Sequence, residues 1–207
     1  MSRNFFFRRS LQPFNNKKNC SMKKNVWVCG LVGGLVLAIV MLVSTSMCYS
    51  SDNFDSSMVL GYASMVLAFS LIFVGVKNYR DKYNGGVISF GKAFKIGLFI
   101  TLIASSMYVL AWVVDYYLFV PDFMDKYTAH VLKEFKAGGA TEAEIADKTA
   151  EMAGFADMYK NPLVVVLFTY VEVLPVGLVM SLISALLLKR KQGKGKPGDE
   201  IWQMVKE

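Results

Sequence analysis

The sequence has little of what metal, redox and nucleophilic sites require, with one histidine and three cysteines in 207 residues. Cys20, Cys29 and Cys48 do not have the spacing of a metal or redox motif. Cys29 and Cys48 lie at opposite ends of one predicted helix, about 28 Å apart, which is too far for a disulfide. His130 and Glu134 share a helix face but have no third ligand nearby. No HExxH, GxSxG or paired-acid motif is present, so we expect no enzymatic activity, no metal site and no cofactor.

Charge is almost absent from four long apolar blocks, at about residues 26–48, 58–76, 93–120 and 162–188. The chain is 54% hydrophobic. This is a modest excess over the 45–50% of soluble domains, so the distribution of apolar residues is the stronger signal. Helices of these lengths match the roughly 30 Å hydrocarbon core of a bilayer. The pattern predicts an all-α integral membrane four-helix bundle in a membrane domain over residues 26–191.

The positive charge is concentrated next to these blocks. Of 23 Lys and Arg residues, seven precede the first block and six follow the fourth. Five belong to the connection between the second and third blocks, if Lys95 at the start of the third block is included. The other two connections have net charges of −2 and −3. By the positive-inside rule both termini are cytoplasmic, in a bacterial cytoplasmic (inner) membrane. The net charge of +7 then favours anionic lipid headgroups, and we expect no nucleic-acid partner.

The two ends of the chain are predicted to lie outside the bundle. The composition of residues 1–25 predicts a disordered cytoplasmic arm, and that of residues 192–207 predicts a flexible cytoplasmic tail. Two alternatives exist for the arm: it lies on the membrane surface through Phe5, Phe6 and Phe7, or the natural chain starts at Met22. The first apolar block is too long for a signal peptide and is expected to be a retained helix.

Residues 121–161, between the third and fourth blocks, predict a helical hairpin. Apolar side chains recur at helical spacing at Met124, Tyr127, Val131 and Phe135. Gly138 and Gly139 interrupt the pattern, and Thr141 followed by Glu144 is a capping box that begins a second helix. By the charge pattern this amphipathic hairpin is extracytoplasmic, with its apolar face on the membrane or on itself.

The connection between the second and third blocks contains a near match to a phosphate-binding loop. The segment is GVISFGKA, residues 86–93. Ala93 stands where a Ser or Thr would hold magnesium, and apolar helices flank the segment where an α/β unit would be required. We therefore expect a cytoplasmic turn at Asn84, Gly85 and Gly86 and no nucleotide partner.

Small residues recur every fourth position in several blocks and predict close helix contacts. Gly30 and Gly34 form a GxxxG motif, which serves equally well for packing within the chain or for dimerisation. The third and fourth blocks have similar ridges. The candidate helix-packing residues are Gly30, Gly34, Gly97, Thr101, Gly177 and Ser181.

Two acids lie within apolar blocks and form a candidate intramembrane polar site. Glu172 is about 15 Å deep, at the bilayer midplane, and Pro175 leaves a backbone carbonyl without its helical donor close by. Asp115 lies about 7–8 Å below the outer interface, on the same helix face as Tyr108. Glu172 is expected to be either a ligand or proton site, or a neutral side chain that hydrogen-bonds to a neighbouring helix. The side of the third span that bears Asp115 is the first candidate to face it.

Three stretches carry a resemblance to a known family. They are LGYASMVLAFSLIFVGVKNYRDKYNGGVISFGKAFKIG, WVVDYYLFVPDFMDKY and EVLPVGLVMSLISALLLKRK. Over about residues 25–191 the chain resembles the bacterial four-helix membrane proteins catalogued as domain of unknown function four-one-nine-nine. The resemblance implies a multi-pass membrane protein without assigned activity and brings no catalytic residues. It implies that Gly85–Gly86, Gly91–Lys92, the Pro121–Phe123 corner and the Glu172/Pro175 pair belong to the family pattern.

The function expected from these features is structural. We expect a non-enzymatic assembly or interaction protein, with the lipid bilayer, a second copy or another membrane protein as partner and Glu172 as a polar packing contact. The alternative is a small proton- or ion-coupled transporter that uses Glu172 and Asp115. Against it, the sequence has no evident inverted repeat or pair of broken helices.

Overall fold

The computed structural model describes residues 12–51 and 55–190. Within these ranges the chain forms six α-helices, one short π-helix and no strand. The elements in chain order are α2 (Gln12–Ser51), α3 (Asp55–Asn78), η1 (Tyr79–Tyr83), α4 (Phe90–Leu118), α5 (Phe123–Ala137), α6 (Glu142–Tyr159) and α7 (Pro162–Leu188). The all-α prediction is confirmed.

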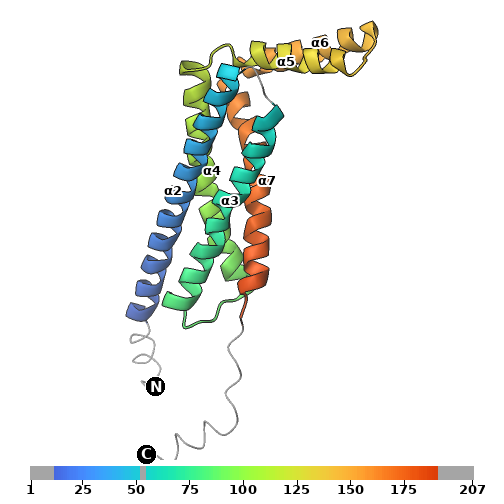
Figure 1. The fold of residues 1–207 in the computed structure, drawn as a ribbon. Helices are drawn as coiled ribbons and strands as arrows, with labels where there is room; N and C mark the ends of the chain where they lie inside the picture. Colours follow the sequence, from blue (N-terminus) through green and yellow to red (C-terminus); the bar gives the residue numbers. More distant parts are fainter. Residues whose placement is uncertain (1–11, 52–54, 191–207) are drawn as a thin grey trace, which may run out of the picture.

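The long helices α2, α3, α4 and α7 lie side by side, and α5 and α6 project sideways from one end of them (Figure 1). Helix α4 packs on both α2 and α7, and α3 closes the arrangement by packing on the same two helices. Consecutive long helices run in opposite directions. We call the end that carries α5 and α6 the hairpin end, and the end with the α3–α4 connection the loop end.

Four of the helices are long and apolar enough to cross a membrane, over residues 22–50, 61–83, 90–118 and 162–188. The fourth predicted block matches α7 residue for residue. The first helix differs, because α2 begins at Gln12 and residues 12–25 are therefore helical, not disordered. Pro13 suits a first helical turn, and no Gly or Pro interrupts the chain from there to Cys29. Residues 1–11 of the predicted arm and the predicted tail, 192–207, lie outside the described residues.

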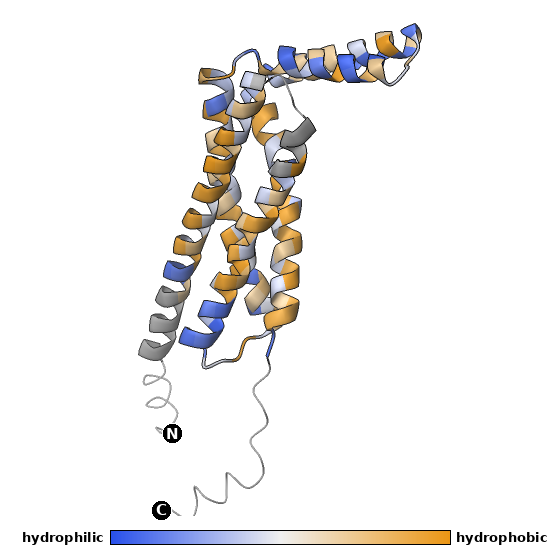
Figure 2. Cartoon of the chain, in the orientation of Figure 1, coloured by the Kyte–Doolittle hydropathy of each residue, from blue (hydrophilic) through white to orange (hydrophobic). Residues whose placement is uncertain are grey.

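The sides of the four long helices are apolar. Figure 2 shows hydrophobic residues along the bundle and hydrophilic ones on the hairpin and at the loop end. Many large apolar side chains are exposed here, among them Trp27, Val32, Leu67, Leu110, Leu167 and Leu187. Soluble monomers rarely expose such continuous apolar surface, so these sides require an apolar solvent or partner.

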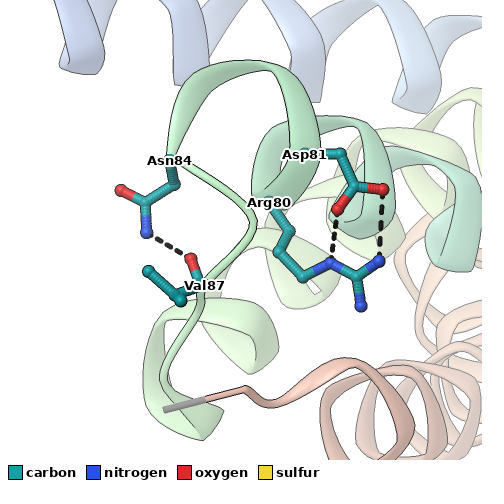
Figure 3. Close-up of polar contacts among 4 residues, drawn as sticks. All are labelled: Arg80, Asp81, Asn84 and Val87. Atoms are coloured by element: carbon teal, nitrogen blue, oxygen red, sulfur yellow. Dashed lines mark hydrogen bonds and ion pairs between the residues drawn. The ribbon is translucent and has the colours of Figure 1, made fainter. Parts of the chain in front are cut away.

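The α3–α4 connection forms the predicted turn, shown in Figure 3. Gly85 and Gly86 have φ angles of 66° and 77°, a region that glycine adopts without steric cost. The Asn84 side-chain amide donates to the Val87 carbonyl at 2.5 Å. The backbones of Ile88 and Arg190 then exchange two hydrogen bonds of 3.0 and 2.9 Å. This pairing ties the connection to the residues just after α7. The residues before Gly86 form η1 and a turn, where a phosphate loop would require a buried strand.

Candidate functional site

The predicted small residues of α4 and α7 meet in the structure. The Thr101 hydroxyl lies 3.0 Å from the Ser181 hydroxyl and 3.2 Å from the Gly177 carbonyl oxygen. A Cβ added at Gly97 would lie 2.9 Å from the Ser181 side chain, so the helices touch where these residues are small. The four residues thus form one contact between α4 and α7.

Gly30 and Gly34 bring α2 against α4. A Cβ at Gly30 would come within 2.8 Å of Ile103, and one at Gly34 within 2.8 Å of Met107. Of the two alternatives for this GxxxG motif, the structure shows packing within the chain.

These contacts determine where Glu172 lies. The small ridge of α7 faces α4, and Glu172 lies about 140° around the helix from Gly177. It therefore cannot share that contact. It lines a cavity of about 490 Å³ at the hairpin end.

All six α-helices contribute to the wall of this cavity. Its apolar and aromatic side chains outnumber its polar ones, and most of the polar ones are hydroxyls. The lining residues include Met41, Ser44, Thr45 and Cys48 of α2, Gly61, Tyr62, Ser64 and Met65 of α3, Tyr108 and Trp112 of α4, Phe123, Met124, Tyr127 and Val131 of α5, Lys148, Glu151, Met152, Phe155 and Tyr159 of α6, and Phe168, Thr169 and Glu172 of α7.

The Glu172 carboxylate has no hydrogen bond or ion pair within the part of the chain that the structure describes. Its side chain is exposed, in a cavity that it shares with Tyr108 and Tyr159. Burial and the nearby Glu172 carboxylate raise the pKa of Tyr159 above its usual value. Of the two alternatives for Glu172, the hydrogen bond to a Ser, Thr or Tyr of a neighbouring helix is not present among the described residues.

The structure does not bring Asp115 to Glu172. Asp115 is buried, with 6% of its surface exposed, and is not among the residues that line the cavity. One of its carboxylate oxygens has no hydrogen-bond partner among the described residues. Tyr108, on the same face of α4, does line the cavity, whereas Pro175 lies on the exposed surface of α7. The predicted polar site is thus divided, with Glu172 and Tyr108 in one place and Asp115 in another.

The hairpin is fastened to the bundle at its base. The Tyr49 hydroxyl, at the end of α2, donates to the Asp122 carboxylate. The Lys126 ammonium lies 3.7 Å from the centre of the Tyr49 ring and 3.4 Å from the Tyr49 carbonyl oxygen. The hydrogen bond from Tyr49 holds the pKa of Asp122 below its usual value, and the charge of Lys126 acts in the same direction. On the other side, the Tyr117 hydroxyl donates to the Tyr159 carbonyl at 3.3 Å.

Aromatic rings fill the junction between the hairpin and the bundle. Trp112 meets Phe123 edge-on, with ring centres 5.2 Å apart, and Tyr116 meets Tyr159 at 5.8 Å. Tyr116 is 7% exposed. Phe123 and Tyr159 of the hairpin thus pack against the Tyr116 ring and cover it.

The comparison with family models identifies the chain. Residues 29–190 match the model described as Protein of unknown function (DUF4199). The chain belongs to this family. The match covers α2 from Cys29 onwards, the other three long helices and the hairpin, in agreement with the resemblance that the sequence motifs carry. Neither the search of curated proteins nor the search of solved structures gives a match.

The family description assigns no activity, so the chemistry of the site rests on its side chains. The described residues contain no group of three or more His, Cys, Asp or Glu that would hold a metal ion. Cys48 lines the cavity as a free thiol, and Cys29 is also free. The site can therefore bind and orient a molecule through the Glu172 carboxylate, several hydroxyls and a wall of apolar and aromatic side chains.

Several residues of the site were not identified from the sequence. The α3 residues Tyr62 and Met65 carry no motif, and their place in the cavity depends on the packing of α3 against α7. The contact between Tyr49 and Asp122 joins residues that are 73 positions apart. The apolar spacing of the hairpin was a usable signal, since Met124, Tyr127 and Val131 all line the cavity.

Proposed function

We propose that this member of the DUF4199 family is a multi-pass protein of the bacterial cytoplasmic membrane. It acts without catalysis, in the assembly of or interaction with other membrane proteins. The four apolar helices and their exposed apolar sides support membrane insertion. The partner is another membrane protein or a second copy of the chain.

The orientation follows from the charges at the two ends of the bundle. Lys77, Arg80, Lys82 and Lys92 lie at the loop end, which we assign to the cytoplasm. The hairpin is then extracytoplasmic. Alkaline phosphatase fused after Arg190 should be inactive, and the same enzyme inserted between Gly138 and Gly139 should be active. The reverse pattern would contradict this orientation.

The observation that carries the interaction role is the hairpin itself, which is fastened at its base and projects beyond the bundle (Figure 1). A pair of helices held in this way presents a fixed surface beside the membrane. A photo-crosslinking amino acid at Glu134 or Glu142, both exposed, should form protein adducts in cells. The same group at Leu110, exposed on the apolar side of α4, serves as control and should yield mainly lipid adducts. An absence of protein adducts from the hairpin positions would exclude this role.

The second candidate function is a proton- or ion-coupled transporter. The unpaired Glu172 in a cavity favours it, and the separate location of Asp115 disfavours a relay between the two acids. Protein reconstituted in liposomes with an internal pH dye would test it. Transport would appear as a proton flux that E172Q abolishes, whereas a wild-type protein without flux under an imposed gradient excludes this candidate.

A further inference from the structure

The cavity at the hairpin end has the dimensions of a small-molecule site. Its volume of about 490 Å³ lies within the range of roughly 300–1,000 Å³ that ligand pockets occupy. Its wall is mainly apolar and aromatic, with few polar groups to orient a ligand. A molecule that fits it must be largely hydrophobic.

The charge of the wall favours a cation. Three of the lining side chains are charged, namely Lys148, Glu151 and Glu172. Lys148 and Glu151 form an ion pair of 2.8 Å and offset each other. Among the residues that the structure describes, the Glu172 carboxylate has no partner, so the wall carries a formal charge of −1 when Glu172 is ionised. This carboxylate would repel an anionic ligand, and a neutral ligand would leave it without a counter-ion.

The side chains around Glu172 strengthen this preference. Tyr108, Trp112, Tyr159 and Phe168 line the same cavity, and aromatic rings attract cations through the negative charge of their faces. Four methionines, Met41, Met65, Met124 and Met152, also line the wall. Methionine side chains adapt to irregular shapes, so the site tolerates ligands of different outlines.

We propose that this cavity binds hydrophobic organic cations, with Glu172 as their counter-ion. The ligand class comprises aryl-substituted phosphonium and ammonium ions. The positive centre lies near Glu172 and the rings, and the apolar groups lie against the methionines. This goes beyond the assembly role, and binding to the purified protein is measured independently of membrane orientation or hairpin partners.

The test compares two ions of the same shape and opposite charge. Tetraphenylphosphonium and tetraphenylborate are titrated separately into the full-length protein in nanodiscs, and the partition of each ion into protein-free nanodiscs is subtracted. We expect saturable binding of the phosphonium at one site and none of the borate. Equal binding of both ions, or no saturable binding of the phosphonium, overturns the proposal.

Two variants locate the site. E172Q removes the charge with little change of volume and should weaken phosphonium binding by at least about tenfold. In Gly61→Phe the charge remains but a ring enters the cavity. A Cβ at Gly61 has no atom within 4 Å, so a side chain can leave the backbone there without a clash. This variant should lower binding by at least the same factor, and it keeps the test valid if E172Q does not fold.

Each variant has a matched control. Gly154 on α6 also has open space around an added Cβ but does not line the cavity, so Gly154→Phe should bind like the wild type. Asp115→Asn changes the other acid of the apolar helices and should also leave binding unchanged. Saturable binding that persists in both E172Q and Gly61→Phe would place the cation elsewhere and overturn the proposal. The proposal would also be overturned if a neutral lipid copurified with the protein, remained bound in E172Q and was displaced in Gly61→Phe.

Discussion

The Thr101 hydroxyl donates a hydrogen bond of 3.2 Å to the carbonyl oxygen of Gly177, across the contact between α4 and α7. Thr101 has no exposed surface, and Gly177 is buried. In an apolar environment the Thr101 hydroxyl has no water to bond to, so it needs the Gly177 carbonyl as its partner. The bond in turn requires the close approach of the two helices that their small residues permit. The contact holds the small face of α7 against α4 and leaves Glu172 on another face.

Gly177→Ala should destabilise the protein. The added Cβ would overlap the Thr101 methyl carbon and lie 3.0 Å from its hydroxyl oxygen. Overpacking of this kind costs about 1–3 kcal/mol. Thermal unfolding in detergent should show a lower Tm, and Thr101→Ser should recover part of the loss, because it removes the methyl group and keeps the hydroxyl.

The control is Gly61→Ala on α3, where an added Cβ meets no atom within 4 Å. Replacing glycine by alanine within a helix stabilises it by about 0.5–1 kcal/mol when no contact opposes the change. Gly61→Ala should therefore leave the Tm unchanged or raise it. An equal loss of Tm at Gly177 and Gly61 would show that the α4–α7 contact is looser than described.

Gly30→Ala should also lower the Tm, whereas Gly33→Ala should not. A Cβ at Gly30 would lie 2.8 Å from the stiff, branched Ile103, but one at Gly33 would find its nearest neighbour at 3.8 Å. If the GxxxG motif instead served a dimer, Gly30→Ala would change the mass of the detergent-solubilised particle and leave its Tm intact. Light scattering combined with thermal unfolding distinguishes these outcomes.

The sequence was informative where short-range chemistry decides the structure. The bounds of α7 follow from Pro162 at the start, an apolar run in which Glu172 is the one charged residue, and lysine at the end. The capping box of Thr141 and Glu144 was predicted and is present at the start of α6. The start of α2 was missed, because Lys and Asn residues before Val26 are as compatible with helix as with disorder.

The candidate site depends on distances that the sequence does not contain. Helical periodicity placed Tyr108 and Asp115 on one face of α4. It does not decide which of the two faces Glu172. The register of α7 against α4 decides between them, and Tyr108 is the one in the cavity. The cavity itself requires all six α-helices at once, including the two helices of the hairpin.

Thr141→Ala should loosen the start of α6. The Thr141 hydroxyl accepts from the Glu144 backbone N–H at 3.4 Å, and the Glu144 carboxylate accepts from the Thr141 N–H at 2.8 Å. Loss of such a cap costs about 0.5–2 kcal/mol, so hydrogen exchange should accelerate in the first turn of α6. Thr149→Ala, within the same helix, is the matched control, and its exchange should not increase since alanine favours helix interiors. Unchanged exchange in Thr141→Ala would show that the cap contributes nothing.

Tyr49→Phe should raise the pKa of Asp122, because the hydrogen bond from the Tyr49 hydroxyl is the main cause of its lowered value. A carboxylate with a lowered pKa stabilises the folded form fully above its unfolded pKa of about 3.9, and this contribution is lost as the pH falls through the folded pKa. The junction between α2 and the hairpin should thus persist at pH 4 in the wild type. The ¹³C shift of the Asp122 carboxyl carbon, followed against pH, should titrate below the usual value in the wild type and nearer to it in Tyr49→Phe. Tyr62→Phe, on α3, is the control and should leave the titration unchanged. An identical midpoint in Tyr49→Phe and the wild type would show that Tyr49 does not hold the hairpin through Asp122.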